Sequence, residues 1–372
     1  MKAPVAICLF YLCSFLSFTS LPAHAQAESS TQDEQAPQAT ARIIGGIFTQ
    51  AGELPWQAFV RIDFSENGTE AYQCGGVVID QETVLTAAHC MVNAGRMATP
   101  QHVRVWAGIT SLENASNQNM TPVSTIVVHP NYNSSNFHHD IAIIRLAMSL
   151  PPRAIPLRIA SIGTQQRADT EFANTWVVNG ARPANLLVSG WGSVVPGNDR
   201  GVILLKQTLL SGVPDRSCDA LWGSTVYPQV YSLFVCAGPP TPELYRDSCF
   251  GDSGGPLVWR DPQASSDPDF GLRLVGLVSF GEGCAGNLPG VYTQVSTYLS
   301  WIDSVLGSGF NPTPASVFTT NPFLQDYSRA GLEDFGTRTN NGSDGGGSVS
   351  LFVLFALLWL VFRRFSDGIR MD

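Results

Sequence analysis

The hexapeptide GDSGGP at residues 251–256 contains the residues with the clearest chemical potential in the chain. A serine hydroxyl is a weak nucleophile at neutral pH, and it needs an adjacent base to take its proton. The glycines around Ser253 allow a reacting carbonyl group to approach the backbone and leave N–H groups free to point at it. The segment therefore indicates a serine nucleophile for acyl transfer, with a glycine-rich structural turn as the alternative.

The base for this serine must precede it in the chain. The segment also fits the G-x-S-x-G pattern of the α/β-hydrolases, but in that fold the serine comes before its histidine. All histidines of this chain come before Ser253, at positions 24, 89, 102, 129, 138 and 139. His89 is the strongest candidate because it lies between small residues and a cysteine, in TAAHC at 86–90. The histidines at 102, 129, 138 and 139 compete with it, but each alone is more often a surface or packing residue.

Asp140 is the predicted partner of His89. It precedes the apolar stretch IAIIRL at 141–146. A lone carboxylate at the head of a buried strand costs free energy unless another group pairs with it. A neutral histidine that keeps its proton on the ring nitrogen far from the serine is such a partner. The residues therefore predict a serine, a histidine base and an orienting acid.

The elements that must position these residues are mostly strands. Short apolar stretches separated by turn residues recur between residues 43 and 306, at 76–79, 103–106, 141–146, 186–188 and 274–280. This spacing predicts an all-β sandwich or barrel. Apolar residues then recur at spacings of three and four over 295–306, which predicts an amphipathic helix. A unit of this size is large for one sheet and natural for two packed barrels.

Composition excludes two broad classes. The chain has 372 residues, of which 44% are hydrophobic, so it has enough apolar material for a sizeable core and is not disordered throughout. Its net charge of −9 speaks against a nucleic-acid binder, which needs a basic surface. We therefore expect no nucleic-acid partner.

These motifs resemble the trypsin/chymotrypsin-type serine proteases. The matching strings occur in the order of that family: IIGG at 43–46, TAAHC at 86–90, DIA at 140–142, SGWG at 189–192, DSCFGDSGGP at 247–256 and PGVYT at 289–293. The resemblance covers 43 to about 306 and fits poorly at 161–185, which we interpret as a variable loop. It implies two packed six-stranded antiparallel β-barrels, a C-terminal helix and an active site in the cleft between the barrels.

The resemblance also assigns catalytic roles. Ser253 would attack the scissile carbonyl, His89 would take and return the proton, and Asp140 would orient the imidazole and stabilise its cation. Backbone N–H groups of Gly251 and Ser253 would form the oxyanion hole. A protease-like binding module without catalysis is the alternative function, but such proteins usually lack a triad residue.

The primary substrate pocket is implied at Asp247, six residues before Ser253. Asp247 would form its floor, Gly281 and Gly290 its walls, and Ser248 would add a hydrogen bond. A carboxylate at the bottom of a pocket with small walls predicts peptide or protein substrates with Arg or Lys before the cut bond.

Activation by cleavage after Arg42 is implied as well. Residues 26–42 are polar and poor in apolar residues, which predicts a disordered pro-segment. The new α-ammonium group of Ile43 would then pair with Asp252 inside the protein. Because either partner alone would be a buried unpaired charge, the pair would act as a switch.

The cysteine count indicates an oxidising compartment. Cys8 and Cys13 lie in the predicted signal peptide, and the even remainder suggests three disulfides with fifteen possible connectivities. The resemblance implies the pairs Cys74–Cys90, Cys218–Cys236 and Cys249–Cys284. No cysteine pair has the C-x-x-C spacing of a zinc site, and only Glu113 is acidic in the loop at 108–123 where trypsins chelate calcium. We therefore expect no metal and no cofactor.

The N-terminus predicts export. Lys2, the apolar run 5–18 and the small residues at 23 and 25 follow the order of a secretory signal peptide, which predicts a signal at 1–25. A membrane anchor is the alternative, but the apolar run is short.

The C-terminus predicts attachment to the cell surface. Residues 307–348 have the composition of a flexible linker, the apolar run 349–362 predicts a short hydrophobic helix, and 363–372 form a basic tail that should stay cytoplasmic. A core helix, a permanent anchor and a glycolipid-anchor signal are alternatives. The tail resembles the GlyGly-type C-terminal sorting tags of Gram-negative bacteria, which an intramembrane rhomboid-like protease cuts. We therefore expect a bacterial protein, secreted or associated with the cell surface, and a monomer.

Overall fold

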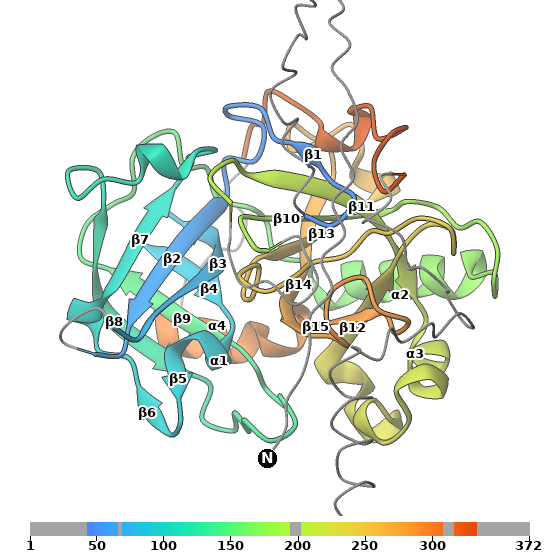
Figure 1. Ribbon diagram of the computed structural model, residues 1–372, viewed down its shortest axis with the longest axis horizontal. Helices are drawn as coiled ribbons and strands as arrows, with labels where there is room; N and C mark the ends of the chain where they lie inside the picture. The colour runs from blue at the N-terminus through green and yellow to red at the C-terminus, as the bar shows by residue number, and fades with distance from the viewer. Residues whose placement is uncertain (1–42, 66–68, 194–201, 308–315, 333–372) are drawn as a thin grey trace, which may run out of the picture. The chain divides into compact units, whose positions relative to one another are not determined.

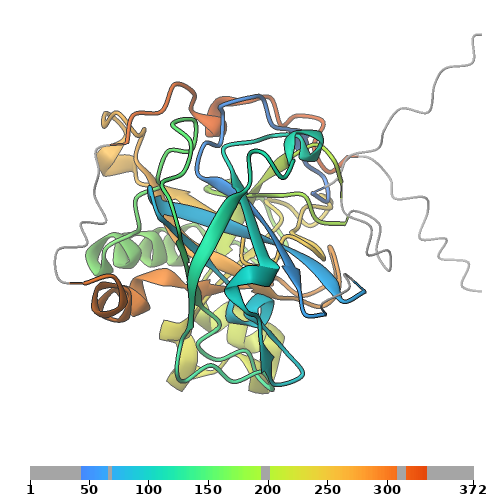
Figure 2. The same cartoon turned by 90° about the vertical axis from the view of Figure 1, so that its left-hand side faces the viewer.

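Two barrels of antiparallel strands carry the fold (Figure 1). The computed structural model describes residues 43–65, 69–193, 202–307 and 316–332. The first barrel is closed, and its strands neighbour one another in the order β2 (Gln57–Asp63), β3 (Ala71–Asp80), β4 (Thr83–Thr86), β9 (Ala142–Leu146), β8 (Thr121–Val128) and β7 (Val103–Ala107). Figure 2 looks onto this barrel.

The second barrel lies in the C-terminal half. Its strands are β10 (Leu186–Gly190), β11 (Lys206–Val213), β12 (Phe234–Gly238), β13 (Pro256–Arg260), β14 (Leu272–Phe280) and β15 (Gly290–Gln294). They are ordered β11-β10-β13-β14-β15-β12, and the additional pairing of β11 with β12 closes the ring, while β1 (Ile47–Phe48) adds to β11 from outside. All pairings are antiparallel. The predicted pair of six-stranded barrels is confirmed.

Alternation along the strands explains the cores. In β2, Ala58, Val60 and Ile62 belong to a buried cluster made only by the first half of the chain. Phe59, between them, belongs to a different cluster that residues of both barrels share. Successive side chains of a strand point to opposite faces, so one face fills the barrel and the other packs against the second barrel. The cleft between the barrels is thereby held by a common apolar core.

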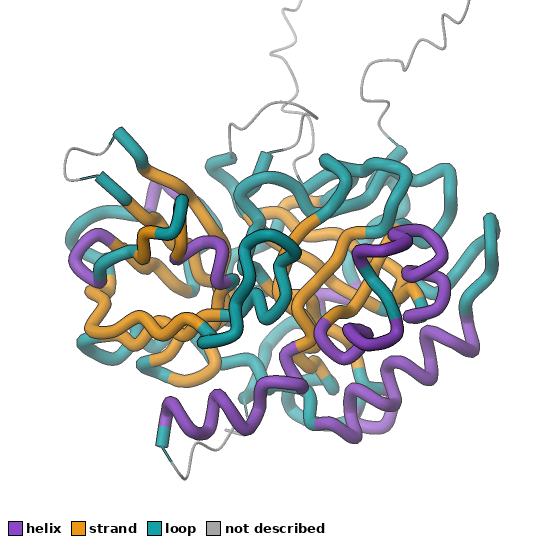
Figure 3. The backbone as a smooth tube through the Cα atoms, turned by 90° about the horizontal axis from the view of Figure 1, so that it is seen from below, coloured by secondary structure: helices purple, strands orange, loops and turns teal. Residues whose placement is uncertain are grey.

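Helices occupy the outside of the strands (Figure 3). The α-helices are α1 (Ala88–Met91), α2 (Ile162–Thr175), α3 (Asp215–Trp222) and α4 (Leu299–Leu306). Short 3₁₀ turns lie at η1 (Pro100–His102), η2 (Leu112–Asn114), η3 (Gly223–Thr225), η4 (Pro228–Leu233), η5 (Pro262–Ala264), η6 (Val295–Tyr298) and η7 (Pro322–Leu324), and β5 (Val92–Asn93) pairs with β6 (Arg96–Met97). The predicted C-terminal helix is confirmed, with its first turn in the 3₁₀ form.

Helix α2 corrects the interpretation of 161–185 as a variable loop. The side chain of Ser161 caps it by accepting a hydrogen bond from the Thr164 N–H. Its buried residues include Ala168 and Phe172, four positions apart on one face. A Cβ atom at Gly212 of β11 would lie 2.2 Å from the Phe172 ring, so the glycine makes room for the helix.

Residues 316–332 depart from the flexible linker that we expected at 307–348. Phe318, Tyr327 and Ala330 are buried in the cluster that both barrels share. These three apolar residues, spaced through a polar sequence, supply the free energy that orders the segment. The predicted signal at 1–25, pro-segment at 26–42, hydrophobic helix at 349–362 and basic tail at 363–372 lie outside the described residues. Within the described ranges, no helix is long and apolar enough to cross a membrane.

Candidate active site

His89 and Asp140 form a hydrogen-bonded pair. His89 lies in α1, directly after β4, and Asp140 lies just before β9, the strand that pairs with β4. The Nδ1 atom of His89 is 2.7 Å from Oδ2 of Asp140, and the backbone N–H of His89 donates to Oδ1 at 2.8 Å. Strand pairing thus brings together two residues that are far apart in the sequence and fixes both the ring and its backbone.

Asp140 is held by further donors that the sequence did not reveal. Its side chain is fully buried, and the Ser279 hydroxyl donates to Oδ2 at 2.6 Å. The Thr293 hydroxyl donates to its backbone oxygen at 2.8 Å. Ser279 lies at the end of β14 and Thr293 in β15, so the second barrel fixes an acid that belongs to the first. Charged acceptors bound by several donors are held strongly in one orientation.

The environment raises the pKa of His89 above its ordinary value. Burial alone lowers this pKa, but the charge of Asp140 and the hydrogen bond that His89 donates to it outweigh the burial. The side chain is 21% exposed, so the edge of the ring that faces away from Asp140 is still accessible. The ring is therefore equipped to accept a proton from that side.

Ser253 lies in the loop between β12 and β13 and lines the same cavity as His89. The Gly75 N–H of β3 donates to the Ser253 backbone oxygen at 2.8 Å. A Cβ atom at Gly254, which has a φ of +75°, would lie 2.1 Å from the Thr86 hydroxyl. Glycine at 254 is thus required both by backbone conformation and by space. These contacts dock the loop that carries Ser253 against the segment that carries His89.

The backbone N–H groups of Gly251 and Ser253 have no hydrogen-bond acceptor among the described residues. Gly251 has a φ of +95°, in the region that favours glycine. Free N–H groups next to a nucleophile are what a developing oxyanion needs.

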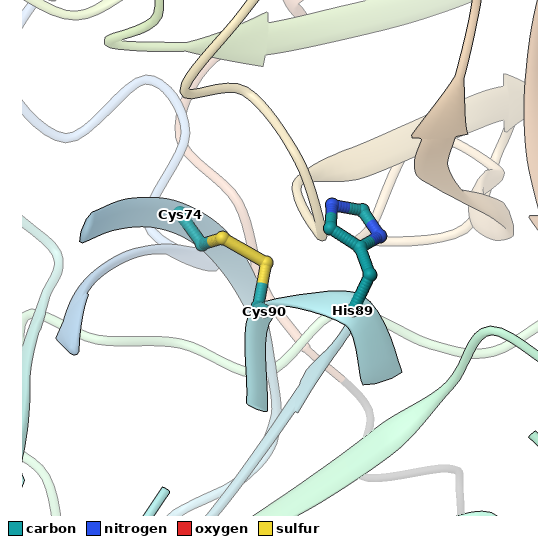
Figure 4. A group of neighbouring side chains, drawn as sticks. All are labelled: Cys74, His89 and Cys90. Atoms are coloured by element: carbon teal, nitrogen blue, oxygen red, sulfur yellow. A yellow bond between two sulfur atoms is a disulfide. The ribbon is translucent and has the colours of Figure 1, made fainter. Parts of the chain in front are cut away.

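The disulfide Cys74–Cys90 lies beside His89 (Figure 4). A ligand atom of each of these three residues lies within 4.8 Å of the others, a spacing that would suit a metal ion. Because both sulfur atoms are joined to each other, neither is a thiolate that could ligate a metal. The disulfide instead ties α1 to β3. Cys218–Cys236 and Cys249–Cys284 are also joined, in the pairs that the resemblance implied.

Asp247 lines a second hollow together with Ala285 and Gly290, and this hollow shares no lining residue with the cavity of His89 and Ser253. Its Oδ1 accepts from the Ser248 N–H and its Oδ2 from the Ala285 N–H, both at 2.8 Å. A Cβ atom at Gly290 would lie 3.2 Å from Oδ1, so glycine keeps the carboxylate accessible. Gly281, the other predicted wall residue, is exposed and does not line this hollow. Burial raises the pKa of Asp247 to about 7, against the two backbone hydrogen bonds, which lower it.

Asp252 is fully buried beside Ser253. Its oxygens accept from the N–H groups of Gly192 at 2.7 Å and Cys249 at 2.8 Å. Burial raises its pKa to about 7. No side-chain cation within the described residues forms an ion pair with it. Ile43, the first described residue, is fully buried as well.

Comparison with known proteins identifies the family. The family model described as Trypsin matches residues 43–302. Chymotrypsin-like elastase family member 1 of Homo sapiens is 33% identical over 285 residues, which cover 75% of this chain and 97% of the relative. The chain belongs to the trypsin family.

Two further relatives of this trypsin-family chain are larger proteins. Transmembrane protease serine 5 of Homo sapiens is 33% identical over 263 residues, covering 70% of this chain and 51% of the relative. Phenoloxidase-activating enzyme 1 of Spodoptera litura is 31% identical over 279 residues, covering 72% of this chain and 67% of the relative. The chain thus spans about half the length of the first of these and most of the elastase.

A cavity of about 740 Å³ beside the His89–Asp140 pair was not foreseen. It is lined by His89, Ser253 and residues of the first barrel. Its lining includes five aromatic side chains and one cation: Phe59, Phe64, Tyr72, Trp106, Phe250 and Arg61. These residues are scattered over β2, β3, β7 and two loops, so no local pattern in the sequence of this trypsin-family chain marks them.

Proposed function

We propose that this chain is a trypsin-like serine endopeptidase that hydrolyses peptide bonds after Arg or Lys. The observation that carries the proposal is the His89–Asp140 pair at 2.7 Å with Ser253 on the same cavity. Hydrolysis proceeds in two acyl-transfer steps. The substrates are peptides or proteins, and the chemistry requires no cofactor.

The first step transfers the acyl group to the enzyme. Ser253 Oγ attacks the scissile carbonyl carbon while His89 takes the hydroxyl proton on Nε2. Asp140 holds the proton on Nδ1 and stabilises the imidazolium. The oxyanion accepts hydrogen bonds from the N–H groups of Gly251 and Ser253. When the C–N bond breaks, His89 gives its proton to the leaving amine, and water repeats the sequence to release the acid.

The second candidate function is a protease-like binding module without catalysis. The intact triad speaks against it, since no member is substituted. Rapid-mixing kinetics with an acylating active-site titrant distinguish the two. After cleavage at Arg42, a catalytic chain releases close to one equivalent of leaving group in a burst. No burst from correctly cleaved protein would refute the endopeptidase.

Activation is proposed to follow cleavage after Arg42. The new α-ammonium group of Ile43 pairs with Asp252, which is buried next to Ser253 and accepts hydrogen bonds from two backbone N–H groups. Before cleavage, an ionised Asp252 is costly in this position, because no side-chain cation among the described residues forms an ion pair with it. Ile43 and Ile44 are fully buried, so the terminus created at Ile43 would lie inside the protein, where it can supply the missing positive charge.

We expect Arg42→Gln to remain an inactive zymogen, because the bond can no longer be cut by an Arg-specific protease. Its kcat/KM should be at least about 10²-fold lower, the order expected from loss of one oxyanion donor. Arg42→Lys is the matched control and should be activated normally. Assays should be paired with N-terminal sequencing. Full activity in Arg42→Gln without a terminus at Ile43 would contradict this switch.

The pH dependence follows from the raised pKa values of Asp247 and His89. The third raised value, that of Asp252, applies to the unpaired carboxyl, and its proposed pairing with the Ile43 ammonium lowers it in the cleaved enzyme. A carboxyl with a raised pKa takes up its proton at a higher pH, so the floor at Asp247 becomes neutral below about pH 7. His89, whose pKa is also raised, becomes protonated as the pH falls, and it then no longer acts as a base. For an Arg substrate, log kcat/KM should therefore fall with a slope approaching 2 in acid. Asp247→Ser acting on a neutral substrate should give a slope of 1. Equal slopes would contradict the assignment.

Export and sorting of the chain complete the proposal. The signal at 1–25 directs secretion, and the GlyGly-type tag at 345–372 is cut by a rhomboid-like intramembrane protease, which leaves a monomeric product released or attached at the surface of a Gram-negative cell. The support is the order of apolar, small and basic residues at both ends. Mass spectrometry of the mature protein tests it. A mature chain that retains 349–372 would exclude removal of the tag.

A further inference from the structure

Residues 316–332, the C-terminal strap, pack on the catalytic body beyond the part that matches the family. The family match ends at residue 302, whereas the strap begins after the end of α4. Its first anchor is the ring of Phe318, which lies edge-on against Trp56 at 4.7 Å between centroids. The Ser316 hydroxyl donates to the Pro156 backbone oxygen at 2.6 Å. In Figure 1 the strap is the orange-red segment beside β1.

The other end of the strap is bound by Arg246. This arginine is 6% exposed and directly precedes Asp247. Its Nε donates to the backbone oxygen of Ala330 at 3.0 Å, and its Nη2 donates to that of Tyr327 at 2.9 Å. Its Nη1 donates to the Leu209 backbone oxygen at 3.4 Å, outside the strap. A buried guanidinium without acceptors is costly, so the two closer carbonyls of the strap help to hold Arg246 in this position. The strap thus supports the residue next to the floor of the primary pocket.

The strap also touches the segment that activation would create. A Cβ atom at Gly45 would lie 2.6 Å from the Gly331 Cα and 2.0 Å from the Tyr245 backbone oxygen. The Tyr245 N–H donates to the Gly331 oxygen at 3.3 Å, and the Asp247 N–H donates to the Ile44 oxygen at 3.3 Å. Three segments far apart in sequence therefore meet at one point: 44–45, 245–247 and 330–331.

We propose that the C-terminal strap is a positioning element for the primary pocket, which holds the Asp247 loop and the N-terminal segment 43–46 in the competent arrangement. The inference rests on the proposed function. In this proposal the cleaved enzyme exchanges between a competent and a zymogen-like arrangement of these segments. The strap binds the competent arrangement through Arg246 and Gly331 and thereby raises the population of that arrangement. When the competent population falls, the apparent affinity of ligands for the primary pocket falls by the same factor.

The test compares full-length variants that differ only in which strap side chains they lose. Phe318→Ala with Tyr327→Ala removes two buried anchors, whereas Val317→Ala with Leu324→Ala removes two side chains that are 61% and 75% exposed. The buried pair should raise KM for an Arg peptide and the Ki of benzamidine by about fivefold or more. Its kcat should fall less, because saturating substrate restores the competent arrangement. The exposed pair should match the wild type.

A single-residue variant guards against misfolding of the double one. Gly331 has a φ of +80°, and a Cβ atom there would lie 3.0 Å from the Tyr245 oxygen and from the Arg246 side chain. Gly331→Ala therefore pushes the strap away at its contact with the pocket loop and leaves Phe318 and Tyr327 in place. It should raise KM and Ki in the same direction as the buried pair.

A pH readout separates positioning from general stabilisation. The α-ammonium group of Ile43 is expected to lose its proton at high pH, which ends the competent arrangement. When that arrangement is less favoured, the alkaline limb of kcat/KM should move down toward the pKa of about 8 of a free terminus. If the strap only stabilises the fold, the strap variants should have a lower Tm but an unchanged alkaline limb, provided that each variant is assayed below its Tm.

The outcomes distinguish this inference from the proposed function. A wild type that gives no titration burst would refute the endopeptidase and leave the strap without a pocket to position. With a normal wild-type burst, unchanged KM, Ki and alkaline limb in both strap variants would overturn the inference. Parallel shifts in both, with the exposed pair unchanged, would support it.

Discussion

Replacing Ser253 by alanine should lower kcat/KM for peptide hydrolysis by at least about 10⁴-fold and leave the fold unchanged. The substitution removes only the hydroxyl group, whose Oγ is the atom that we propose forms the acyl-enzyme. Within the described part of the chain, this hydroxyl makes no hydrogen bond, so its removal leaves no buried partner unpaired. Circular dichroism and Tm should therefore match the wild type, and the burst with an acylating titrant should vanish.

A second substitution makes this prediction sharper. If Ser253 and His89 act as one unit, the double variant Ser253→Ala with His89→Ala should lose little more activity than either single variant. Independent contributions would instead multiply the two losses. A Ser253→Ala variant that keeps wild-type activity, after removal of any contaminating protease, would refute the site assignment.

The parts of this site that could be predicted lie in short contiguous strings. TAAHC, DIA and GDSGGP each hold a reactive residue together with the small residues that its surroundings require, as Gly254 does against Thr86. The barrels were also predictable, because the alternation that buries Val60 on one side and Phe59 on the other is a property of the strand itself.

The parts that were missed depend on contacts between distant residues. Ser279 and Thr293 hold Asp140 from the second barrel, and nothing near either residue in the sequence marks that role. The strap was missed because its overall composition is that of a linker, and its three anchors are too widely spaced to give a helical or strand period. Helix α2 had a readable signal, the Ser161 cap, which the poor family resemblance of that region obscured.

The preference for Arg and Lys before the cut bond should amount to at least about 10³ in kcat/KM over Phe and Ala in otherwise identical peptides. Asp247 lines its hollow with each oxygen held by one backbone N–H, which leaves lone pairs of both oxygens for a ligand. A guanidinium fork can pair with such a carboxylate through two parallel hydrogen bonds. An apolar side chain would leave the carboxylate buried and unpaired.

Two substitutions place the origin of this preference. Asp247→Ser removes the floor charge and should cost about 10³ or more against Arg peptides, while activity against Phe peptides is kept or rises. Glu282→Gln is the matched control, because Glu282 is an exposed acid at the rim, where its carboxylate lies 3.5 Å from the Cβ position of Gly286, a residue that lines the hollow. If a general negative field at the rim attracted the cation, both variants would lose the preference, and salt would weaken it strongly. If the buried carboxylate of Asp247 is the source of the preference, only Asp247→Ser should change the substrate profile.

The Ser248 hydroxyl, 3.2 Å from that of Tyr292, gives the shorter lysine a second acceptor, so Ser248→Ala should reduce Lys cleavage more than Arg cleavage.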